Sequence, residues 1–399
     1  MNPLIRGERD DRASLDDLAL FEVLAREDTP SPSRRLLDDQ PVRSPHISHR
    51  RQGSFNLMSD LHVDWSYKEL LDSHAVAEPL VVGGVRCHGG YDSDGTYISP
   101  RTKNRWPAIK AWQQQRAEQF STALLDIALD TWPGAYPNVA QAKFLLREGV
   151  AEPIIARLTQ IGTVEGFGSM IRYSPIPDLQ RCFVEDVRGT ATWHLGRGLY
   201  EAHARDEAGY KSEGGHKQMW FAARDIAFER PLTEDQTQVM MDRMFGYSAA
   251  AAASAEPMFP DVDQSLELLI QSMSRLLLIE ISAYHVFAWA EEVLADTELV
   301  AGDGEASRLV SYIRADEAPH VEYLKTTLSE MRDRTFVTES GRHIAGTEVV
   351  GQIWDRARAE SVGTRHEANV RIVRSEIEHC LEGRARGKEI LAEFDDLAA

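Results

Sequence analysis

Residues 311–325 read SYIRADEAPHVEYLK, and the helix that they predict carries Glu317 and His320 on one face. Residues three apart on a helix point in the same direction, so these two side chains can bind one metal ion. Glu213 and His216 repeat this spacing earlier in the chain. Two such pairs, completed by one Glu from each of two partner helices, are the ligands of a carboxylate-bridged dinuclear metal site. The sequence therefore predicts a helical core built around two metal ions.

The Glu-x-x-His spacing alone is weak support for a metal site, because it also occurs by chance. A third copy, Glu376 and His379, lies inside a charged run from Ser375 to Lys388. Such a run is typical of a solvated helix face, so we expect no ligand there. The apolar helices predicted around the other two pairs are what distinguish them.

In the second half of the chain, Glu280 lies on the apolar stripe of a long helix predicted for residues 261–296. The other residues of the stripe are Met273, Leu276, Leu277, Tyr284 and Phe287. An unpaired carboxylate buried there would cost several kcal/mol or be protonated, and a cation removes that cost. A turn near Gly302 makes this helix antiparallel to the return helix. Glu280 lies farther from the turn than Glu317, so a bend, a tilt or an irregular turn must adjust the register.

In the first half, Glu213 and His216 share one predicted helical face with several polar and aromatic residues. These are His203, Asp206, Tyr210 and Trp220. The partner carboxylate is expected to be Glu165, whose glycine neighbours would allow another helix or a substrate to approach closely. Glu185 is the alternative, because its spacing to Glu213 better suits a simple helical hairpin. His194 and His203 are candidates for an additional ligand.

Over residues 152–334 this pattern resembles the ferritin-like di-iron carboxylate superfamily, which includes ribonucleotide reductase small subunits, acyl-carrier desaturases, bacterial multicomponent hydroxylases and arylamine N-oxygenases. The most specific element is the Asp316-Glu317-x-x-His320 form of the second motif. The resemblance implies a ferritin-like four-helix bundle with extra helices. It implies two bound Fe ions, or a manganese–iron pair, with Asp316 as the partner of a ligand histidine. The implied metal ligands are Glu165, Glu213, His216, Glu280, Glu317 and His320.

Two positions depart from the family pattern. Gly214 and Gly215 stand inside the first motif, where glycine weakens a helix. Arylamine N-oxygenases carry a histidine four residues before the second-half glutamate, and here that position is Ile313. The second departure lowers the support for that subfamily.

By this resemblance, the expected function is that of an O2-dependent non-haem di-iron oxygenase or oxidase. It would hydroxylate, desaturate or N-oxidise a small organic substrate. Because the chain shows no flavin, haem or iron–sulfur signature, electrons would come from a ferredoxin or a reductase. Family analogy also implies a homodimer. A ferritin-type ferroxidase and a metal-free helical interaction protein are the alternatives. Tyr210, Tyr284 and Tyr323 lie one turn from predicted ligands, where packing is the simpler role and a radical the alternative.

Composition narrows the classes of partner. The chain has 399 residues, a formal net charge of -19 and three cysteines that are widely spaced. The acidic balance argues against nucleic acid and anionic membranes as partners. No apolar run reaches the length of a membrane span, since the best one contains Glu280 and His285. Three scattered cysteines form neither a zinc pattern nor a disulfide framework, which indicates a cytoplasmic protein.

The predicted organisation has three parts. Residues 1–105 form an irregular arm, loosely draped over 26–52. It contains a β hairpin between Val81–Val85 and Gly95–Ile98 that turns at residues 92–95. Residues 106–345 form the helical domain, in which 246–260 cross between the two halves. Residues 346–399 form a charged helical pair on the outside. The predicted fold class is therefore mostly α.

Overall fold

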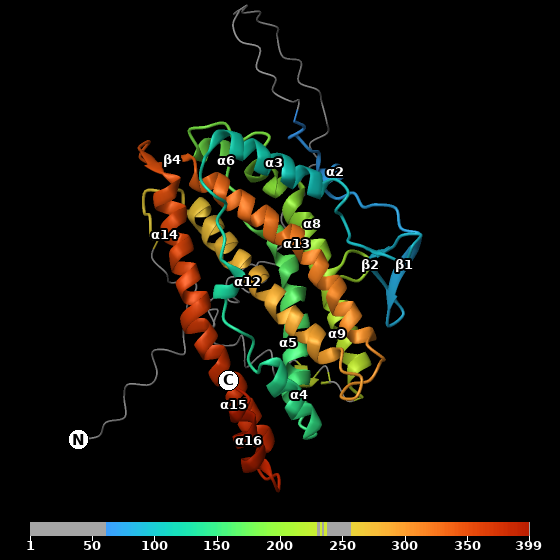
Figure 1. Ribbon diagram of the computed structural model, residues 1–399. Coiled ribbons are helices and arrows are strands. Elements are labelled where there is room, and N and C mark those ends of the chain that lie inside the picture. Colours follow the sequence, from blue (N-terminus) through green and yellow to red (C-terminus); the bar gives the residue numbers. More distant parts are fainter. Residues whose placement is uncertain (1–60, 230–231, 234, 238–256, 399) are drawn as a thin grey trace, which may run out of the picture.

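The computed structural model describes residues 61–229, 232–233, 235–237 and 257–398. These residues are mostly helical, with two small antiparallel sheets (Figure 1). The predicted fold class, mostly α with a minor β component, is confirmed. The arm expected over residues 1–52 lies outside the described residues, as do residues 246–256 of the expected crossover.

Five helices form the centre of the fold and run side by side in Figure 1. They are α5 (Glu152–Gly168), α8 (Tyr200–Ala208), α9 (His216–Ala227), α12 (Gln264–Leu294) and α13 (Glu305–Arg332). Helix α12 packs along α13, α5 packs against α8 and α9, and α13 also contacts α9. Helices α8 and α9 follow each other in the chain and are separated only by a loop. Counted as one interrupted helix, they give the centre the layout of four helices.

The connection between α12 and α13 accounts for the difference in spacing between Glu280 and Glu317 that the sequence shows. Asp263 caps α12 by accepting a hydrogen bond from the backbone N–H of Leu266 at 2.9 Å. Helix α12 ends at Leu294, before the glycine turn, so an irregular connection separates it from α13. Glu280 therefore lies 14 residues before the end of its helix, and Glu317 lies 12 residues after the start of the next. The two carboxylates reach the same level without a bend.

A loop, rather than a continuous helix, joins α8 to α9. Helix α8 ends at Ala208 and is followed by Gly209 at a positive φ of 83°. A Cβ on Gly215 would lie 2.4 Å from the carbonyl oxygen of Asp206, so only glycine fits this close return of the chain. At the start of α9, the side-chain carbonyl oxygen of Gln218 accepts a hydrogen bond from the Gly215 N–H at 2.9 Å.

Two small sheets make up the β structure of the described residues. Strands β1 (Glu78–Val82), β2 (Val85–Tyr91) and β3 (Tyr97–Ile98) form one sheet in that order, and β4 (Thr335–Val337) pairs with β5 (His343–Ala345). The first turn is Gly83-Gly84, with φ values of 55° and 78°. The prediction that residues 81–85 form one strand is therefore wrong, because two successive glycines at positive φ reverse the chain. The turn predicted at residues 92–95 is confirmed between β2 and β3.

The remaining helices surround the centre. They are α2 (Tyr67–Leu70), α3 (Arg105–Gln119), α4 (Val139–Arg147), α6 (Leu179–Cys182), α7 (Ala191–His194), α14 (Gly346–Ala359), α15 (Arg365–Leu381) and α16 (Gly387–Asp396), with short turns at Leu129–Thr131, Ser169–Tyr173, Leu195–Leu199 and Glu360–Thr364. Helices α14 and α15 continue through one π-helical turn and follow the outside of the bundle, as Figure 1 shows in red. Helix α3 ends at Gln119, and Arg116 in its last turn donates to the carbonyls of Thr122 and Ala123 beyond that end.

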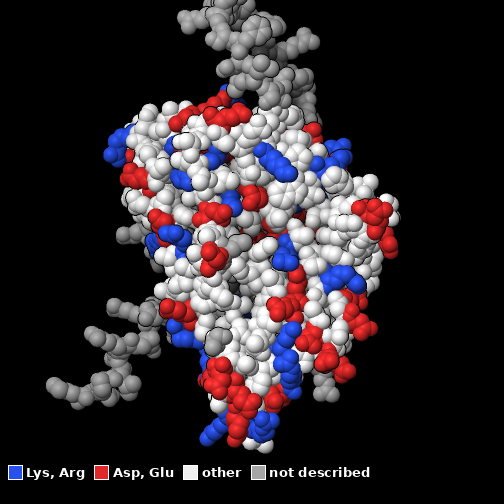
Figure 2. All heavy atoms as spheres, viewed as in Figure 1, with Lys and Arg blue, Asp and Glu red and all other residues white. Residues whose placement is uncertain are grey.

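The surface carries charges of both signs. On the face shown in Figure 2, lysines and arginines are interspersed with aspartates and glutamates, so the net negative charge does not collect in one patch there. Among the described helices, none combines the length and the apolar character that crossing a bilayer requires.

Candidate metal centre

Seven acidic and imidazole side chains meet in the middle of the four-helix centre. All are buried, and none is more than 9% exposed. They are Glu165 from α5, His203 and Glu207 from α8, His216 from α9, Glu280 from α12, and Glu317 and His320 from α13. They form two groups of four, each with one ligand atom per residue within 4.8 Å of the others, and Glu207 belongs to both groups.

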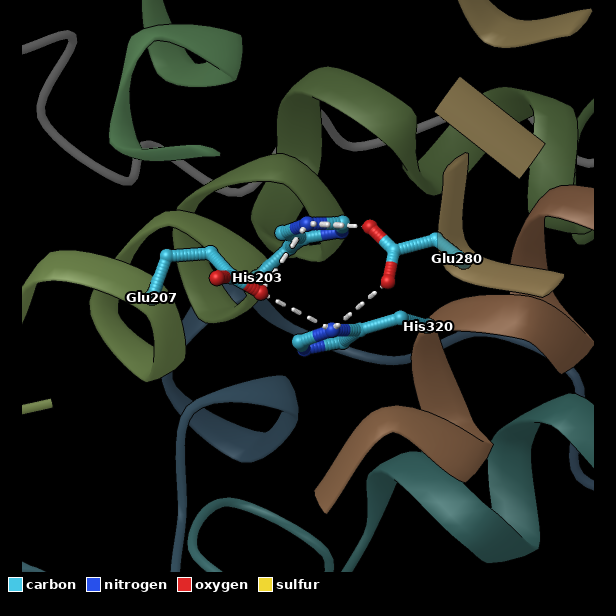
Figure 3. A group of neighbouring side chains, drawn as sticks. All are labelled: His203, Glu207, Glu280 and His320. Carbon is cyan, nitrogen blue, oxygen red and sulfur yellow. Dashed lines mark ion pairs between the residues drawn. The ribbon is translucent and has the colours of Figure 1, made fainter. Parts of the chain in front are cut away.

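The first group contains His203, Glu207, Glu280 and His320 (Figure 3). Nε2 of His203 lies 3.2 Å from Oε1 of Glu280 and 3.5 Å from Oε1 of Glu207. Nδ1 of His320 lies 3.2 Å from the same Glu207 oxygen. The two imidazole rings are parallel, with centroids 3.8 Å apart. Two imidazoles and two carboxylates from three helices therefore converge on one small volume.

The second group contains Glu165, Glu207, His216 and Glu317. Nδ1 of His216 lies 2.9 Å from Oε1 of Glu317, 3.4 Å from Oε2 of Glu165 and 3.5 Å from Oε2 of Glu207. Gly168 on α5 permits this approach, because a Cβ there would lie 2.5 Å from Cγ of Glu207. One imidazole and three carboxylates thus form a second site beside the first.

Glu207 belongs to both groups, and Glu317, a member of the second, also directs one oxygen to a histidine of the first. Oε1 of Glu207 faces His203 and His320, whereas its Oε2 faces His216. Oε1 of Glu317 faces His216, whereas its Oε2 lies 2.7 Å from Nδ1 of His320. Glu165 and Glu280 each belong to one group only. This is the arrangement in which two bridging and two terminal carboxylates hold a pair of metal ions.

Five of the atoms that face the interior of the cluster lack the hydrogen bonds that buried polar atoms normally make, although Nδ1 of His320 and Oε2 of Glu317 bond to each other at 2.7 Å. Among the described residues, no hydrogen-bond partner is present for Oε2 of Glu165, Nε2 of His203, Oε1 of Glu207, Nδ1 of His216 or Oε1 of Glu317. Burial, and then repulsion between neighbouring carboxylates, raises the pKa values of Glu207 and Glu317 well above the usual range. Cations would satisfy these orphaned atoms and replace the protons that the crowded carboxyls would otherwise retain.

His203 and His320 each direct the second ring nitrogen away from the cluster to a hydrogen-bond partner, whereas that of His216 makes no hydrogen bond among the described residues. Nδ1 of His203 lies 2.9 Å from the hydroxyl of Tyr323, and Nε2 of His320 lies 2.9 Å from Oδ2 of Asp206. Nε2 of His216 lies 3.5 Å from Oδ2 of Asp316. Outer partners of this kind fix the orientation and tautomer of metal-ligating histidines. Asp316 therefore stands where the sequence predicts it, beside a histidine of the cluster.

Asp206 is held by two buried arginines. Oδ1 of Asp206 accepts from Nε of Arg101 at 2.6 Å, and Nη2 of Arg105 lies 2.7 Å from Oδ2. Burial opposes ionisation of this aspartate, but Arg101 and Arg105 hold its pKa well below the usual value. A charged Asp206 can then accept the Nε2–H of His320 and leave Nδ1 free to face the cluster.

The Asp206→Asn variant should bind metal about 10- to 100-fold more weakly, because an outer partner of a ligand histidine is altered. It should also be about 3–5 kcal/mol less stable, since both arginines then lose their buried counter-charge. Metal titration and urea unfolding measure the two effects. Asp225→Asn is the matched control, because Asp225 is half exposed and pairs with Arg224. Equal metal affinity in both variants would contradict this role for Asp206.

Five of the six residues that the sequence predicts as ligands lie in the cluster, and Glu213 does not. Its carboxylate is 41% exposed and pairs with Nε of Arg86 and Nδ1 of His88, both at 3.2 Å. The prediction for Glu213 is wrong because the glycine-rich loop removes it from the helix. The Gly214 N–H donates to the carbonyl of Arg86, so the loop is bound to strand β2 and leads away from the cluster.

Glu207 takes the position predicted for Glu213, and the sequence contains a signal for it. The tripeptide Asp-Glu-Ala occurs at residues 206–208 and again at 316–318. In each copy the Glu enters the cluster and the Asp faces a histidine from the other copy's half: Asp206 faces His320, and Asp316 faces His216. In the first copy the loop lies between the glutamate and the histidine, so His216 follows Glu207 by nine residues instead of three.

The other candidates divide clearly. Glu165 lies in the cluster, whereas the alternative Glu185 accepts hydrogen bonds from the backbone N–H and the hydroxyl of Thr335. His203 lies in the cluster, whereas His194 accepts from the Trp65 N–H and contacts the Thr190 carbonyl.

The candidate tyrosines also divide. Tyr210 lies in the loop after α8, under the guanidinium of Arg205 at 3.6 Å. Tyr284 is 41% exposed on α12. Neither belongs to the cluster. Tyr323, by contrast, is fully buried and contacts His203.

No protein-family model, no curated protein and no solved structure matches this chain.

Proposed function

We propose that this protein is a dinuclear metalloenzyme that uses O2 to oxidise a small organic substrate, as an oxygenase or oxidase of the ferritin-like di-iron type. The observation that carries the proposal is the pair of shared carboxylates. Glu207 and Glu317 each turn one oxygen toward each of the two groups. A single-ion site would not need such a division, whereas a pair of ions about 3.5–4 Å apart does.

The ligand types favour iron, or manganese with iron, over zinc. Four carboxylates and three imidazoles offer mostly hard oxygen donors, and no cysteine belongs to either group. The cluster is also larger than the closed four-ligand set that structural zinc prefers. When bound, a pair of redox-active ions would supply the activation of O2.

The chain's own residues would hold and isolate that pair. His203 and His320 bring two imidazoles to one group, and His216 brings one to the other. The two groups are therefore inequivalent, which would allow the two ions to differ in affinity. The near-complete burial of all seven side chains excludes bulk water from the reacting volume.

The ligand count also bears on the reaction type. Ile313 lowers the support for the arylamine N-oxygenase pattern, but His203 lies four residues before Glu207 in the first half of the chain. His203 on α8 therefore offers a third imidazole, although the position on α13 where that subfamily has a histidine is Ile313. N-oxidation accordingly stands beside hydroxylation and desaturation as a proposed reaction. A ferredoxin or reductase remains the proposed electron donor, and the homodimer remains a prediction.

The test is anaerobic loading with ferrous iron, followed by exposure to O2. We expect about two irons per chain, as a dinuclear site requires. We also expect O2 uptake that stops after one round unless a reductant is added. Glu213→Ala should behave like the unaltered protein. Iron accumulation far above two per chain would favour the ferroxidase alternative, and no iron binding at all would favour the metal-free interaction protein.

A further inference from the structure

Three tyrosines lie in contact between the metal centre and the surface. Tyr97 in β3 donates its hydroxyl hydrogen to Oδ2 of Asp316 at 2.8 Å, and that same oxygen lies 3.5 Å from Nε2 of His216. The ring of Tyr97 stacks on that of Tyr312, with centroids 4.3 Å apart and planes 14° apart. Tyr91 in β2 contacts both rings edge-on, with its centroid 5.9 Å from that of Tyr312 and 6.2 Å from that of Tyr97.

The fold makes room for this contact. Gly89 has a φ of 79°, and a Cβ at this position would lie 2.5 Å from the hydroxyl oxygen of Tyr97. Only a glycine therefore lets the phenol pass β2 and reach Asp316. Tyr312 lies one turn before Asp316 on α13, so the helix that supplies Glu317 also supplies the middle ring. Tyr91 and Tyr312 are both partly exposed, and the series of rings thus ends at the surface.

A second tyrosine at the cluster provides a contrast. Tyr323 contacts His203, and its ring lies 6.4 Å from that of Tyr200. Both are buried, at 0% and 4% exposure. Among the described ring contacts, this pair leads to no exposed aromatic side chain. Of the two series, the one through Tyr97 connects the cluster with the surface.

We propose that Tyr97, Tyr312 and Tyr91 form a one-electron path between the His216 side of the centre and the surface. This inference rests on the proposed function, since it needs an oxidised group bound at His216. Stacked and edge-on rings in contact keep each transfer short, and phenols are among the few side chains that can be oxidised by one electron and reduced again. The path would be the entry point for the external electron donor.

Electrons and protons balance along the path. Tyr97 loses one electron inward, and its hydroxyl proton moves along the hydrogen bond to Asp316. Tyr312 restores the electron to Tyr97, which regains its proton from Asp316. Tyr312 is partly exposed, so it releases its own hydroxyl proton to solvent and takes one back when Tyr91 restores its electron. Tyr91, also partly exposed, exchanges its hydroxyl proton with solvent in the same way. A one-electron reductant in solution, such as a reduced iron–sulfur protein, finally reduces Tyr91. All three tyrosines end unchanged, the reductant is oxidised by one electron, and the group at His216 is reduced by one.

The test exposes iron-loaded protein to O2 without any reductant, so that the tyrosines themselves are the electron source. Electron paramagnetic resonance should detect a tyrosyl radical, and peptide mapping by mass spectrometry should find oxidised Tyr91. In Tyr97→Phe the ring stack is kept, but the phenol beside the cluster, to which Tyr91 and Tyr312 both lead, is lost. Oxidation at Tyr91 should then fall at least about tenfold, as a barrier higher by about 1.4 kcal/mol would cause.

Tyr136→Phe is the matched control, because Tyr136 contacts Phe394 in the separate apolar cluster of α4, α15 and α16. It should leave oxidation of Tyr91 unchanged. Equal oxidation of Tyr91 in Tyr97→Phe and the unaltered protein would overturn the path, as would an absence of oxidised tyrosine. Bound iron is measured in every sample. If iron binds and O2 is consumed, such a result rejects the path alone; if no iron binds, the proposed function and the path fail together.

Discussion

Replacing Glu207 with alanine should abolish the binding of both metal ions, although neither the sequence spacing nor the Glu-x-x-His motif points to this residue. Glu207 offers one oxygen to each group, so its loss opens both sites at once. We expect the affinity for each ion to fall by more than the roughly 10- to 100-fold typical of residues that only support a ligand. Elemental analysis after gel filtration, with circular dichroism as a check of folding, measures the effect.

Three further variants sharpen this prediction. Glu213→Ala should retain both ions, because Glu213 pairs with Arg86 and His88 outside the cluster. Glu280→Ala should mainly weaken the ion beside His203 and His320, and Glu165→Ala the ion beside His216. A Glu213→Ala variant that loses metal while Glu207→Ala keeps it would show that the assignment of the bridging residue is wrong.

The second large effect concerns the stability of the metal-free protein at different pH values. Burial, and then repulsion between carboxylates, raises the pKa values of Glu207 and Glu317 in the folded state. A carboxyl with a raised folded pKa stabilises the fold fully below its unfolded pKa. That contribution is lost as pH rises toward the folded pKa. Between the unfolded and the folded pKa, each carboxyl that stays protonated only in the folded state lowers the free energy of unfolding by about 1.4 kcal/mol for each unit that the pH rises.

Other groups limit the useful pH window. Burial, together with neighbouring charges, lowers the pKa values of His88 and His320 to about 3, so these groups increase stability as pH rises toward about 6.5. Burial raises the pKa of the Cys87 thiol to about 11, which matters above about pH 9. Burial opposes protonation of His216, but Glu317 and Glu207 raise its pKa well above the usual value. Between about pH 7 and 8.5, the carboxyls of the cluster and this imidazole therefore determine the pH dependence together.

Chemical unfolding of chelator-treated and metal-loaded protein at the two ends of this window tests the prediction. The metal-free protein should lose stability as pH rises, whereas the loaded protein should not, since cations replace the protons. Metal-free Glu207→Gln should lose less than the metal-free unaltered protein, because an amide mimics the protonated carboxyl without titrating. A metal-free protein that is equally stable at both pH values would contradict the account.

Regular helical patterns made much of this fold predictable from sequence. The apolar stripe of α12 correctly placed Glu280 in the interior, and the helical spacing in α13 correctly brought Glu317 and His320 to one face. The glycines of α5 correctly indicated a close approach of helices, which the contact between Gly168 and Glu207 realises. In each case a short-range pattern determines the direction of a side chain.

The wrong prediction of Glu213 and the missed Glu207 have one physical cause. The backbone between them adopts conformations that the periodicity of a helix does not describe. Gly209 and Gly215 let the chain leave the helix and return within seven residues, so His216 pairs with Glu207 rather than Glu213. The pairing of Gly214 with β2 that draws the loop outward joins segments far apart in sequence. Periodicity cannot show such a contact. The repeated Asp-Glu-Ala was the available signal, and it requires comparing the two halves of the chain.

The most direct measurement is anomalous X-ray scattering at the iron edge from crystals of iron-loaded protein. Two peaks about 3.5–4 Å apart should appear between Glu207 and Glu317, one beside His216 and the other beside His203 and His320. A single peak, or peaks elsewhere in the molecule, would contradict a dinuclear centre at this position.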